Sequence, residues 1–368
     1  MLKKIVLGID TRFYNNKPSG IGTYTYELIR ELINFKDIEL VLFLNKNSPL
    51  LIDEYFINTK KIIVNEKLFS INELITFGYK IDKSDINLYH TPSFIMPFLR
   101  RKKYVMTIHD LIHINRPEDY TVFHKIYYEF IVKRNAKKAS KIITDSEYSK
   151  KDLENWLKID NIVSIPLAHS RNFFPNLGIT DLFYKNSINL NSYFIYVGNN
   201  KNHKNLKTLL KVYSKIKEVY ENYWDLVLVT EKSNELLSLC FEYFIIDNVK
   251  FIDKVSINDL AILYSNAKYL ILPSLYEGFG LTALEAMACK CPVLMSNVTS
   301  LKEIGNNSCL YFSPYNPNEI FYAMEKIFLN EALRLELSNL GFENSKKFSW
   351  KKTALETLKI YHQVLNHE

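Results

Sequence analysis

Short runs of β-branched and aromatic residues alternate along the chain with longer stretches whose apolar residues recur every three or four positions. The short runs predict strands, which we place near 4–9, 38–44, 61–65, 86–89, 104–108, 141–144, 161–165, 193–197, 225–230, 248–252, 269–272, 292–295 and 309–312. The longer stretches predict helices, near 22–35, 70–80, 120–138, 146–157, 203–221, 233–244, 256–266, 281–289, 316–329 and 349–366. Such alternation is typical of α/β proteins with parallel sheets covered by helices on both faces.

One sheet of about thirteen strands would be unusually wide. The alternation also pauses in a strand-poor stretch that contains Pro166 and Pro175. We therefore predict two doubly wound domains, with boundaries at 1–170 for the first, 171–190 for a linker, 191–348 for the second, and 349–368 for a last helix that crosses back to the first domain. Ligands of such sheets bind outside the carboxyl ends of the strands, so we expect the active site in a cleft where the two domains face each other.

The composition of the 368 residues is that of an ordinary globular protein, with 24% charged and 47% hydrophobic residues. This excludes general disorder. No apolar run approaches the roughly 18 to 20 residues that cross a bilayer, and Asp10 and Arg12 end the first apolar stretch too early for a signal peptide. The four cysteines show no metal-binding spacing, so we expect free buried thiols in a reducing cytoplasm.

The formal net charge is +7, and its excess lies in the first half of the chain. One basic cluster spans Arg100 to Lys103, and another spans Lys133 to Lys141 beside Tyr127, Tyr128 and Phe130. Helix-spaced bases next to aromatic residues suit anionic lipid headgroups. A solvated helix face is the alternative, and we favour it for an ordinary run of charge. No nucleic-acid-binding motif accompanies the bases, so we expect no nucleic-acid partner.

Glycine is scarce, at 10 residues in 368, whereas about 7% is usual. Because glycine lets a ligand approach the backbone closely, the places where it does occur are informative. Five of the ten fall in three loops that follow predicted strands.

The most informative segment runs from Pro273 to Ala288 with the sequence PSLYEGFGLTALEAMA, directly after a predicted strand. Gly278 and Gly280 clear side chains from the turn, so that backbone N–H groups at the start of the next helix can face an anion. Glu285, one turn into that helix, suits the hydroxyls of a ribose, and Glu277 suits a second polyol. The alternative is a helix start with surface glutamates near the helix dipole.

This segment resembles the E-x7-E signature of retaining glycosyltransferases of family 4, with the E-G-F-G-L core intact. The resemblance implies the GT-B fold, in which two Rossmann-like domains face each other across a cleft. It also implies that Glu285 holds the donor ribose, that Glu277 holds the transferred sugar, and that the backbone at Phe279, Gly280 and Leu281 faces the diphosphate. The family is metal-independent, and we find no metal-binding motif, so we expect no metal and no other cofactor.

A second loop, YVGNNKNHKNL, starts at Tyr196 and leads from a strand end at Gly198 into a helix near Lys204. Its ammonium groups are suited to neutralise charge on a departing diphosphate. The loop is similar to the family's glycine, basic loop and Lys-Asn helix start, which assigns Lys204 to the donor. Many members carry arginine after the glycine, where this chain has Asn199, so Lys201 is the candidate for the second positive charge. An ordinary solvent-exposed loop is the alternative.

A third loop, SGIGTY, follows the first predicted strand and contains Gly20 and Gly22. The third glycine of a dinucleotide-binding motif is absent, since Thr25 occupies its position. A plain tight turn would also explain the two glycines. The similarity to the family's first loop indicates instead a segment that closes over the donor phosphates and the acceptor.

The stretch Thr107 to His113 places His109 at the end of a predicted strand. His109 and His113 are four residues apart, but no third metal ligand is evident. By resemblance to the family's His-Asp-Leu segment, His109 contacts the transferred sugar, and it is our candidate catalytic residue together with Lys204 and Glu277. His113 is expected to be structural.

One position departs from the family pattern V-x-F-x-G-x-V, because Asp253 replaces the glycine. This loop lies near the nucleotide base in the family. Asp253 either accepts hydrogen bonds from a guanine edge or caps the helix expected from Ser256, and we favour the cap.

Taken together, the sequence is identified as a member of the retaining glycosyltransferases. We expect transfer of a sugar from a nucleotide-sugar donor, GDP-mannose as first choice, to a glycan or lipid-linked glycan, forming an α-linkage in cell-surface polysaccharide synthesis. We expect a cytoplasmic location, at the inner face of the membrane if the basic clusters touch it. The alternatives are a sugar-nucleotide epimerase of the same fold, and a non-catalytic basic protein that binds membrane or nucleic acid.

Overall fold

A computed structural model describes residues 4–15, 20–98 and 101–366, so that Ser19 of the third loop and Arg100 of the first basic cluster lie outside the described residues. All thirteen predicted strands are confirmed, most within two residues. They are β1 (Ile5–Asp10), β2 (Ile38–Leu44), β3 (Lys60–Ile63), β4 (Leu88–Thr91), β5 (Lys103–Thr107), β6 (Lys141–Thr144), β7 (Ile162–Ser164), β8 (Tyr193–Val197), β9 (Asp225–Val229), β10 (Val249–Ile252), β11 (Leu270–Leu272), β12 (Val293–Ser296) and β13 (Leu310–Phe312).

The chain forms two compact units, the first made of residues 1–167 with 349–368 and the second of residues 168–348. The first unit contains α1 (Gly20–Leu32), α2 (Gly78–Lys83), α3 (Ile112–Asn115), α4 (Val122–Tyr127), α5 (Lys133–Lys138), α6 (Glu147–Leu157) and α15 (Trp350–Asn366). The second contains α7 (Asp181–Lys185), α8 (Leu206–Val219), α9 (Asn234–Glu242), α10 (Ile257–Asn266), α11 (Leu281–Ala288), α12 (Leu301–Gly305), α13 (Pro317–Leu329) and α14 (Glu331–Ser345). The stretch expected as a linker, 171–190, therefore contains α7 and lies within the second unit.

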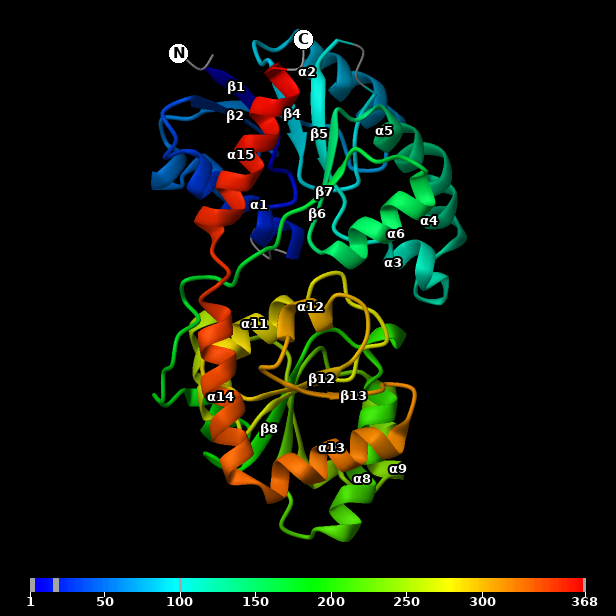
Figure 1. Cartoon of the computed structure of the whole chain (residues 1–368), viewed down its shortest axis with the longest axis vertical. Helices are drawn as coiled ribbons and strands as arrows, with labels where there is room; N and C mark the ends of the chain where they lie inside the picture. Colours follow the sequence, from blue (N-terminus) through cyan, green and yellow to red (C-terminus); the bar gives the residue numbers. More distant parts are fainter. Residues whose placement is uncertain (1–3, 16–19, 99–100, 367–368) are drawn as a thin grey trace. The chain divides into compact units, whose positions relative to one another are not determined.

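The sheet of the first unit is parallel, with the strand order β3-β2-β1-β4-β5-β6-β7. On one face, side chains of α2, α4, α5 and α6 join strand residues such as Phe43 and Tyr104 in one core. α15 packs against α1 (Figure 1). It is held there by the contact of Trp350 with Tyr24 and by the hydrogen bond that Thr353 Oγ1 donates to Pro166 O at 2.7 Å. The last helix of the chain thus completes the first unit.

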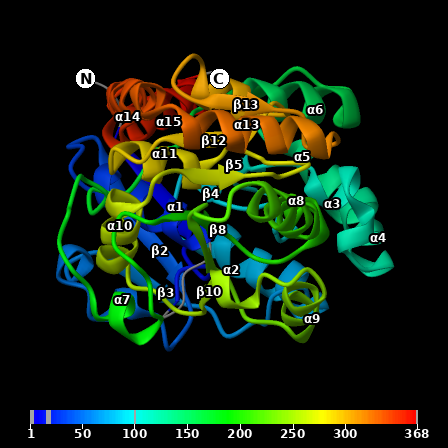
Figure 2. The same cartoon turned by 90° about the horizontal axis from the view of Figure 1, so that it is seen from below.

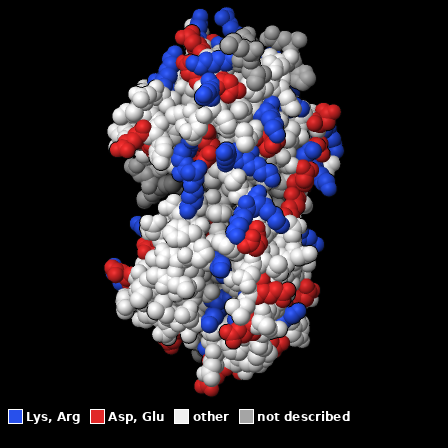
Figure 3. Space-filling view, turned by 60° about the vertical axis from the view of Figure 1, so that its left-hand side comes forward, with Lys and Arg blue, Asp and Glu red and all other residues white. Residues whose placement is uncertain are grey.

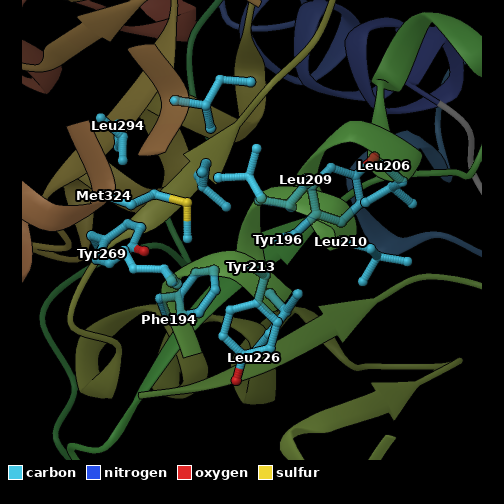
Figure 4. Close-up of a cluster of buried hydrophobic side chains, with 14 of the residues drawn as sticks. Phe194, Tyr196, Leu206, Leu209, Leu210, Tyr213, Leu226, Tyr269, Leu294 and Met324 are labelled. Carbon is cyan, nitrogen blue, oxygen red and sulfur yellow. The ribbon is translucent and has the colours of Figure 1, made fainter. Parts of the chain in front are cut away.

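The sheet of the second unit is also parallel and has the order β10-β9-β8-β11-β12-β13. In Figure 2, α8 and α9 lie on one side of β8, and α10 and α11 lie on the other. The core between the sheet and α8, α9 and α13 is rich in aromatic rings, with Phe194 stacked on Tyr269 at 4.9 Å between centroids (Figure 4). The predicted α/β class with two doubly wound parallel sheets is confirmed.

The helices follow the apolar periodicity with informative exceptions. Ser146 caps α6 as predicted, because its side chain accepts a hydrogen bond from the Ser149 N–H. α14 was not predicted, since its buried side includes Gly341, Asn344 and Ser345, which leave no clear apolar stripe.

Within the described part of the chain, no helix combines the length and the apolar character needed to cross a bilayer. All four cysteines are free and buried, as expected.

Candidate active site

Two loops meet at the carboxyl ends of β8 and β11 in the second unit. The loop after β8 begins at Gly198 and ends at Asn205, which precedes α8. The loop after β11 carries the glutamate-and-glycine segment and leads into α11. They are tied together because the Leu275 N–H donates to His203 O at 2.7 Å and the Asn205 side-chain amide donates to Pro273 O at 3.1 Å. Since neighbouring parallel strands end at the same edge of a sheet, the strand order brings together segments that lie about 75 residues apart along the sequence.

Lys204 and Glu277 form an ion pair across these loops. Lys204 Nζ lies 2.7 Å from Glu277 Oε1, and Ser274 Oγ donates to the same oxygen at 2.7 Å. Burial alone would raise the pKa of Glu277, but the Lys204 ammonium and the Ser274 hydroxyl outweigh it and lower the pKa. Glu277 is therefore a carboxylate at neutral pH, able only to accept hydrogen bonds, and the two residues assigned to sugar and diphosphate lie side by side.

The backbone around Glu277 is held from behind by the segment that precedes α12. Thr299 Oγ1 accepts from the Glu277 N–H at 3.2 Å, and Ser300 Oγ donates to the carbonyl oxygens of Glu277 and Phe279 at 2.9 and 3.1 Å. Gly280, the residue before α11, has φ of +108°, a conformation that favours glycine. A Cβ there would also lie 2.8 Å from Leu301 Cδ2. The loop geometry thus depends on glycine at this position.

Glu285 projects from the first turn and a half of α11 and is partly buried. Burial raises the pKa of Glu285 to about 8, although Tyr264 Oη donates to Glu285 Oε2 at 3.4 Å. The folded protein therefore favours a protonated Glu285 at neutral pH, which can donate as well as accept a hydrogen bond. Its ionisation destabilises the second unit as the pH rises from about 4.5 through about 8.

The remaining predicted residues of the second unit lie around these loops. Lys201 is exposed in the loop after β8. Phe279 is buried against Phe348, and Leu281 is the first residue of α11. Gly278 lies between Glu277 and Phe279 in the turn.

The favoured interpretation of Asp253 as a helix cap is wrong. Ser256 caps α10, because its side chain accepts from the Asp259 N–H at 3.1 Å. Asp253 is exposed just after β10. A hydroxyl directly before the first helical turn reaches the free N–H groups better than a carboxylate three residues earlier.

In the first unit, His109 lies beyond the carboxyl end of β5 and pairs with Asp145 beyond the end of the neighbouring β6. His109 Nδ1 lies 2.8 Å from Asp145 Oδ2, and Nε2 lies 3.1 Å from Pro92 O. Burial lowers the pKa of His109, but the Asp145 carboxylate and the Pro92 carbonyl reverse this and raise it. Because both ring nitrogens face acceptors, the geometry favours a doubly protonated imidazolium.

A buried network of polar side chains lies beside His109, and no sequence pattern predicted it. Tyr361 Oη of α15 and Thr107 Oγ1 lie 2.6 and 2.8 Å from the two ring nitrogens of His90, and Tyr24 Oη lies 3.2 Å from Thr107 Oγ1. Burial lowers the pKa of His90 to about 3, so that ring is neutral. The Tyr24 ring meets His109 edge-on at 4.9 Å. This hydrogen-bonded network joins α1, the sheet and α15 next to His109.

The third predicted loop lies at the start of α1. Gly20 is the first residue of α1, and Gly22 is buried. A Cβ at Gly20 would meet no described atom within 4 Å, so packing within the described part of the first unit does not require glycine there. Upstream, Arg12 is buried in a bidentate pair with Asp10, at 2.9 and 2.7 Å, and also bonds Glu73 at 2.6 Å. This triad, which the sequence reading missed, fixes the chain between β1 and the loop.

Among the described residues, no group of three or more His, Cys, Asp or Glu is placed to hold a metal ion. The His113 ring instead stacks on the Tyr128 ring at 4.7 Å between centroids and contacts the tilted Tyr120 ring at 4.0 Å.

Comparison with known proteins defines the class. Residues 18–168 match the family described as Glycosyltransferase Family 4, and residues 181–344 match the family described as Glycosyl transferases group 1. Together the two matches span most of both units. The chain therefore belongs to the family 4 glycosyltransferases, and it is an enzyme of the glycosyltransferase class. This membership displaces the epimerase and the non-catalytic alternatives.

Similar proteins are known from bacteria. The chain is 26% identical over 373 residues to the O-antigen chain mannosyltransferase B of Escherichia coli, a match that covers 93% of this chain and 96% of that protein. It is 29% identical over 248 residues to the O-antigen chain mannosyltransferase RfbU of Salmonella typhimurium, a match that covers 67% of this chain and 64% of that one.

Solved structures share the fold. Sucrose-phosphate synthase from Thermosynechococcus elongatus superposes with a TM-score of 0.81 at 21% identity, covering 99% of this chain and 100% of that one. Anabaena HepE in complex with UDP and glucose gives 0.75 at 14% identity, covering 97% and 99%. The predicted GT-B fold class is confirmed.

Proposed function

We propose that this glycosyltransferase moves a mannosyl residue from GDP-mannose to a glycan or lipid-linked glycan, with retention of configuration, in cell-surface polysaccharide synthesis. The names of the two bacterial relatives, both O-antigen chain mannosyltransferases, support the sugar and the process. The observation that carries the proposal is the Lys204–Glu277 pair beside the Gly280 turn. It offers a cation for a diphosphate and a carboxylate for sugar hydroxyls within one hydrogen-bonded unit.

The proposed reaction is attack on the face from which the diphosphate departs. The bond between the anomeric carbon and the phosphate oxygen breaks, the acceptor oxygen bonds that carbon, and the acceptor proton passes to the departing phosphate. Lys204, Lys201 and the N–H groups near Phe279, Gly280 and Leu281 stabilise the charge on the diphosphate. Glu277 accepts hydrogen bonds from the sugar, and Glu285 holds the ribose. No carboxylate acts as a nucleophile, in contrast to retaining glycosidases, and no metal takes part.

The proposal also assigns roles to residues of the first unit. His109 acts on the transferred sugar, and Gly20 and Gly22 allow the loop before α1 to approach the phosphates. We place Asp253 near the nucleotide base, where its exposed carboxylate suits a guanine edge. The reaction is proposed to take place on the cytoplasmic side of the membrane that carries the acceptor.

The direct test is thermal stabilisation by a panel of GDP-, UDP-, ADP- and CMP-sugars, each with and without EDTA. We expect the largest rise in melting temperature with GDP-mannose, and no effect of EDTA. Stabilisation by none of the sugars would contradict a nucleotide-sugar donor, and loss of stabilisation with EDTA would contradict metal independence.

Two variants separate donor binding from turnover. Glu285→Ala removes the proposed ribose contact. The apparent affinity for the donor should therefore fall by about tenfold, which corresponds to the loss of roughly one buried hydrogen bond, and the donor-induced rise in melting temperature should shrink. His109→Ala should keep the donor affinity and lower kcat. An unchanged donor affinity in Glu285→Ala removes Glu285 from the site.

A further inference from the structure

The two oxygens of the Glu285 carboxyl group have different surroundings. Oε2 accepts a hydrogen bond at 3.4 Å from the hydroxyl of Tyr264, a fully buried residue of the neighbouring helix α10. Oε1 has no hydrogen-bond partner among the described residues. Glu285 is only partly buried, and Oε1 is not one of the buried polar atoms without a partner. One oxygen is therefore held from the core, and the other is open to a ligand.

Tyr264 is itself fixed by the chain segment that precedes α7. Residues 172–180, here called the strap, contact α10 at two points. Thr180 Oγ1 donates to Asp259 Oδ1 in the first turn of α10 at 2.6 Å. The buried Phe173 ring lies 6.0 Å from the Tyr264 ring between centroids. The strap therefore holds both the helix and the ring that reach the carboxyl group.

Charged groups are scarce around this contact. The strap contains no Lys, Arg, Asp or Glu, and α10 contains only Asp259. In the lower half of the view in Figure 3, a broad area of the second unit likewise carries no charged side chains. Burial raises the pKa of Glu285, and the Tyr264 hydroxyl is the group that lowers it. Tyr264 thus favours the ionised carboxyl group where Glu277 has an ammonium for the same purpose.

The titratable neighbours of Glu285 are neutral near physiological pH. They are Tyr264 and Cys289, the residue at the end of α11. Burial raises the pKa of the Cys289 thiol to about 12 and that of Tyr264 above its ordinary value of 10. A change of charge at this place near neutral pH is therefore the ionisation of Glu285.

Ribose hydroxyls donate hydrogen bonds, and an ionised carboxylate only accepts them. Donors to the charged form favour that form, so a ribose and the Tyr264 hydroxyl act on Glu285 in the same direction. We propose that Tyr264 is a positioning residue for the donor: its hydroxyl orients the Glu285 carboxylate through Oε2 and leaves Oε1 to the ribose. This role rests on the proposed function, in which Glu285 holds the donor ribose. Donor binding then releases the Glu285 proton to the solvent.

The test is the affinity for GDP-mannose of the full chain and of Tyr264→Phe, measured by calorimetry from about pH 7 to about pH 9. The substitution keeps the ring and removes one hydrogen bond to the carboxylate. We expect the affinity to fall about fivefold near pH 7, and the difference to shrink to less than about twofold near pH 9, where Glu285 ionises in both proteins. A merely structural defect would weaken binding equally at every pH.

The matched control is Tyr193→Phe. Tyr193 is also fully buried, and its hydroxyl donates at 2.6 Å to the carbonyl oxygen of Leu263 in the same helix α10. This control should bind GDP-mannose like the unaltered chain at each pH. Glu285→Gln cannot ionise, so it should bind more weakly and lose the pH dependence. Unchanged affinity in Tyr264→Phe would overturn the proposal, and so would a loss that is the same near pH 7 and near pH 9.

A second measurement needs no donor. An NMR titration of the labelled Glu285 carboxyl carbon should show a midpoint about 0.7 pH units higher in Tyr264→Phe, the same fivefold change on a logarithmic scale. An unchanged midpoint would overturn the positioning role even if GDP-mannose binds. Absence of GDP-mannose binding by the unaltered chain would instead contradict the proposed donor, so the two failures are distinguishable.

Discussion

At the scale of single residues, the candidate site depends on pairs of ionisable groups. Lys204 lowers the pKa of Glu277, and Asp145 raises that of His109, in each case against the effect of burial. Glu285 has no such cation, and its pKa rises to about 8. Within the second unit, Glu277 and Glu285 thus hold different protonation states at neutral pH because their partners differ.

The His109–Asp145 pair leads to a prediction about pH. In Asp145→Asn, the strongest influence that offsets burial is lost, while Asp110 and the Pro92 carbonyl remain, so the pKa of His109 should fall. In the unaltered protein, the raised pKa gives stability that is full below about 6.5 and is lost as the pH rises through the folded-state value. In the variant, this loss of stability with rising pH should be smaller.

The measurement is an NMR titration of the histidine ring protons, combined with the pH profile of kcat. His169, whose pKa is lowered by burial in the second unit, serves as an internal control and should titrate alike in both proteins. An unchanged His109 titration in the variant would show that Asp145 does not hold the imidazolium.

At the scale of elements, the strand ends and the helix starts position the chemistry. The turn from β11 into α11 brings Glu277 to Lys204, and the left-handed conformation of Gly280 lets the chain enter the helix. Ser300 ties the same turn to the segment before α12. The loop is therefore held by contacts within its own unit, which is the kind of preorganisation that electrostatic catalysis requires.

Replacing Gly280 by alanine should destabilise the second unit by about 1–3 kcal/mol, because φ of +108° strains an L-residue and the Cβ meets Leu301 Cδ2 at 2.8 Å. Urea unfolding measures the loss. Gly20→Ala is the matched control, since its Cβ meets no described atom within 4 Å, and its unfolding should be nearly unchanged. Equal stability of Gly280→Ala and the unaltered protein would contradict the strain.

At the scale of the whole molecule, α15 returns to the first unit and packs against α1. α15 follows the entire second unit in sequence, yet Trp350 and Tyr361 are buried against Tyr24 and His90 of the first. The fold of residues 1–167 is thus incomplete until α15 has been synthesised.

Trp350→Ala should therefore destabilise the first unit by about 3–5 kcal/mol, the usual cost of truncating a large buried aromatic residue. Calorimetry or urea unfolding should show the transition of the first unit at a lower midpoint. Leu355→Ala, at a more exposed position of the same helix, should change stability by no more than about 0.5 kcal/mol. A similar effect of both substitutions would contradict a specific role of Trp350.

The sequence by itself determined the strands, the longer helices except α14, and the class of enzyme. Strand and helix patterns depend on local alternation of apolar and polar residues, and the motif around Glu277 and Glu285 is contiguous, so both can be recognised without a structure. Only the tertiary structure decided which side chains meet. Lys204 with Glu277, His109 with Asp145, and Tyr361 with His90 are joined by strand order and by the return of α15. Contacts between residues distant in sequence follow from how sheets and helices pack, and no local pattern encodes them.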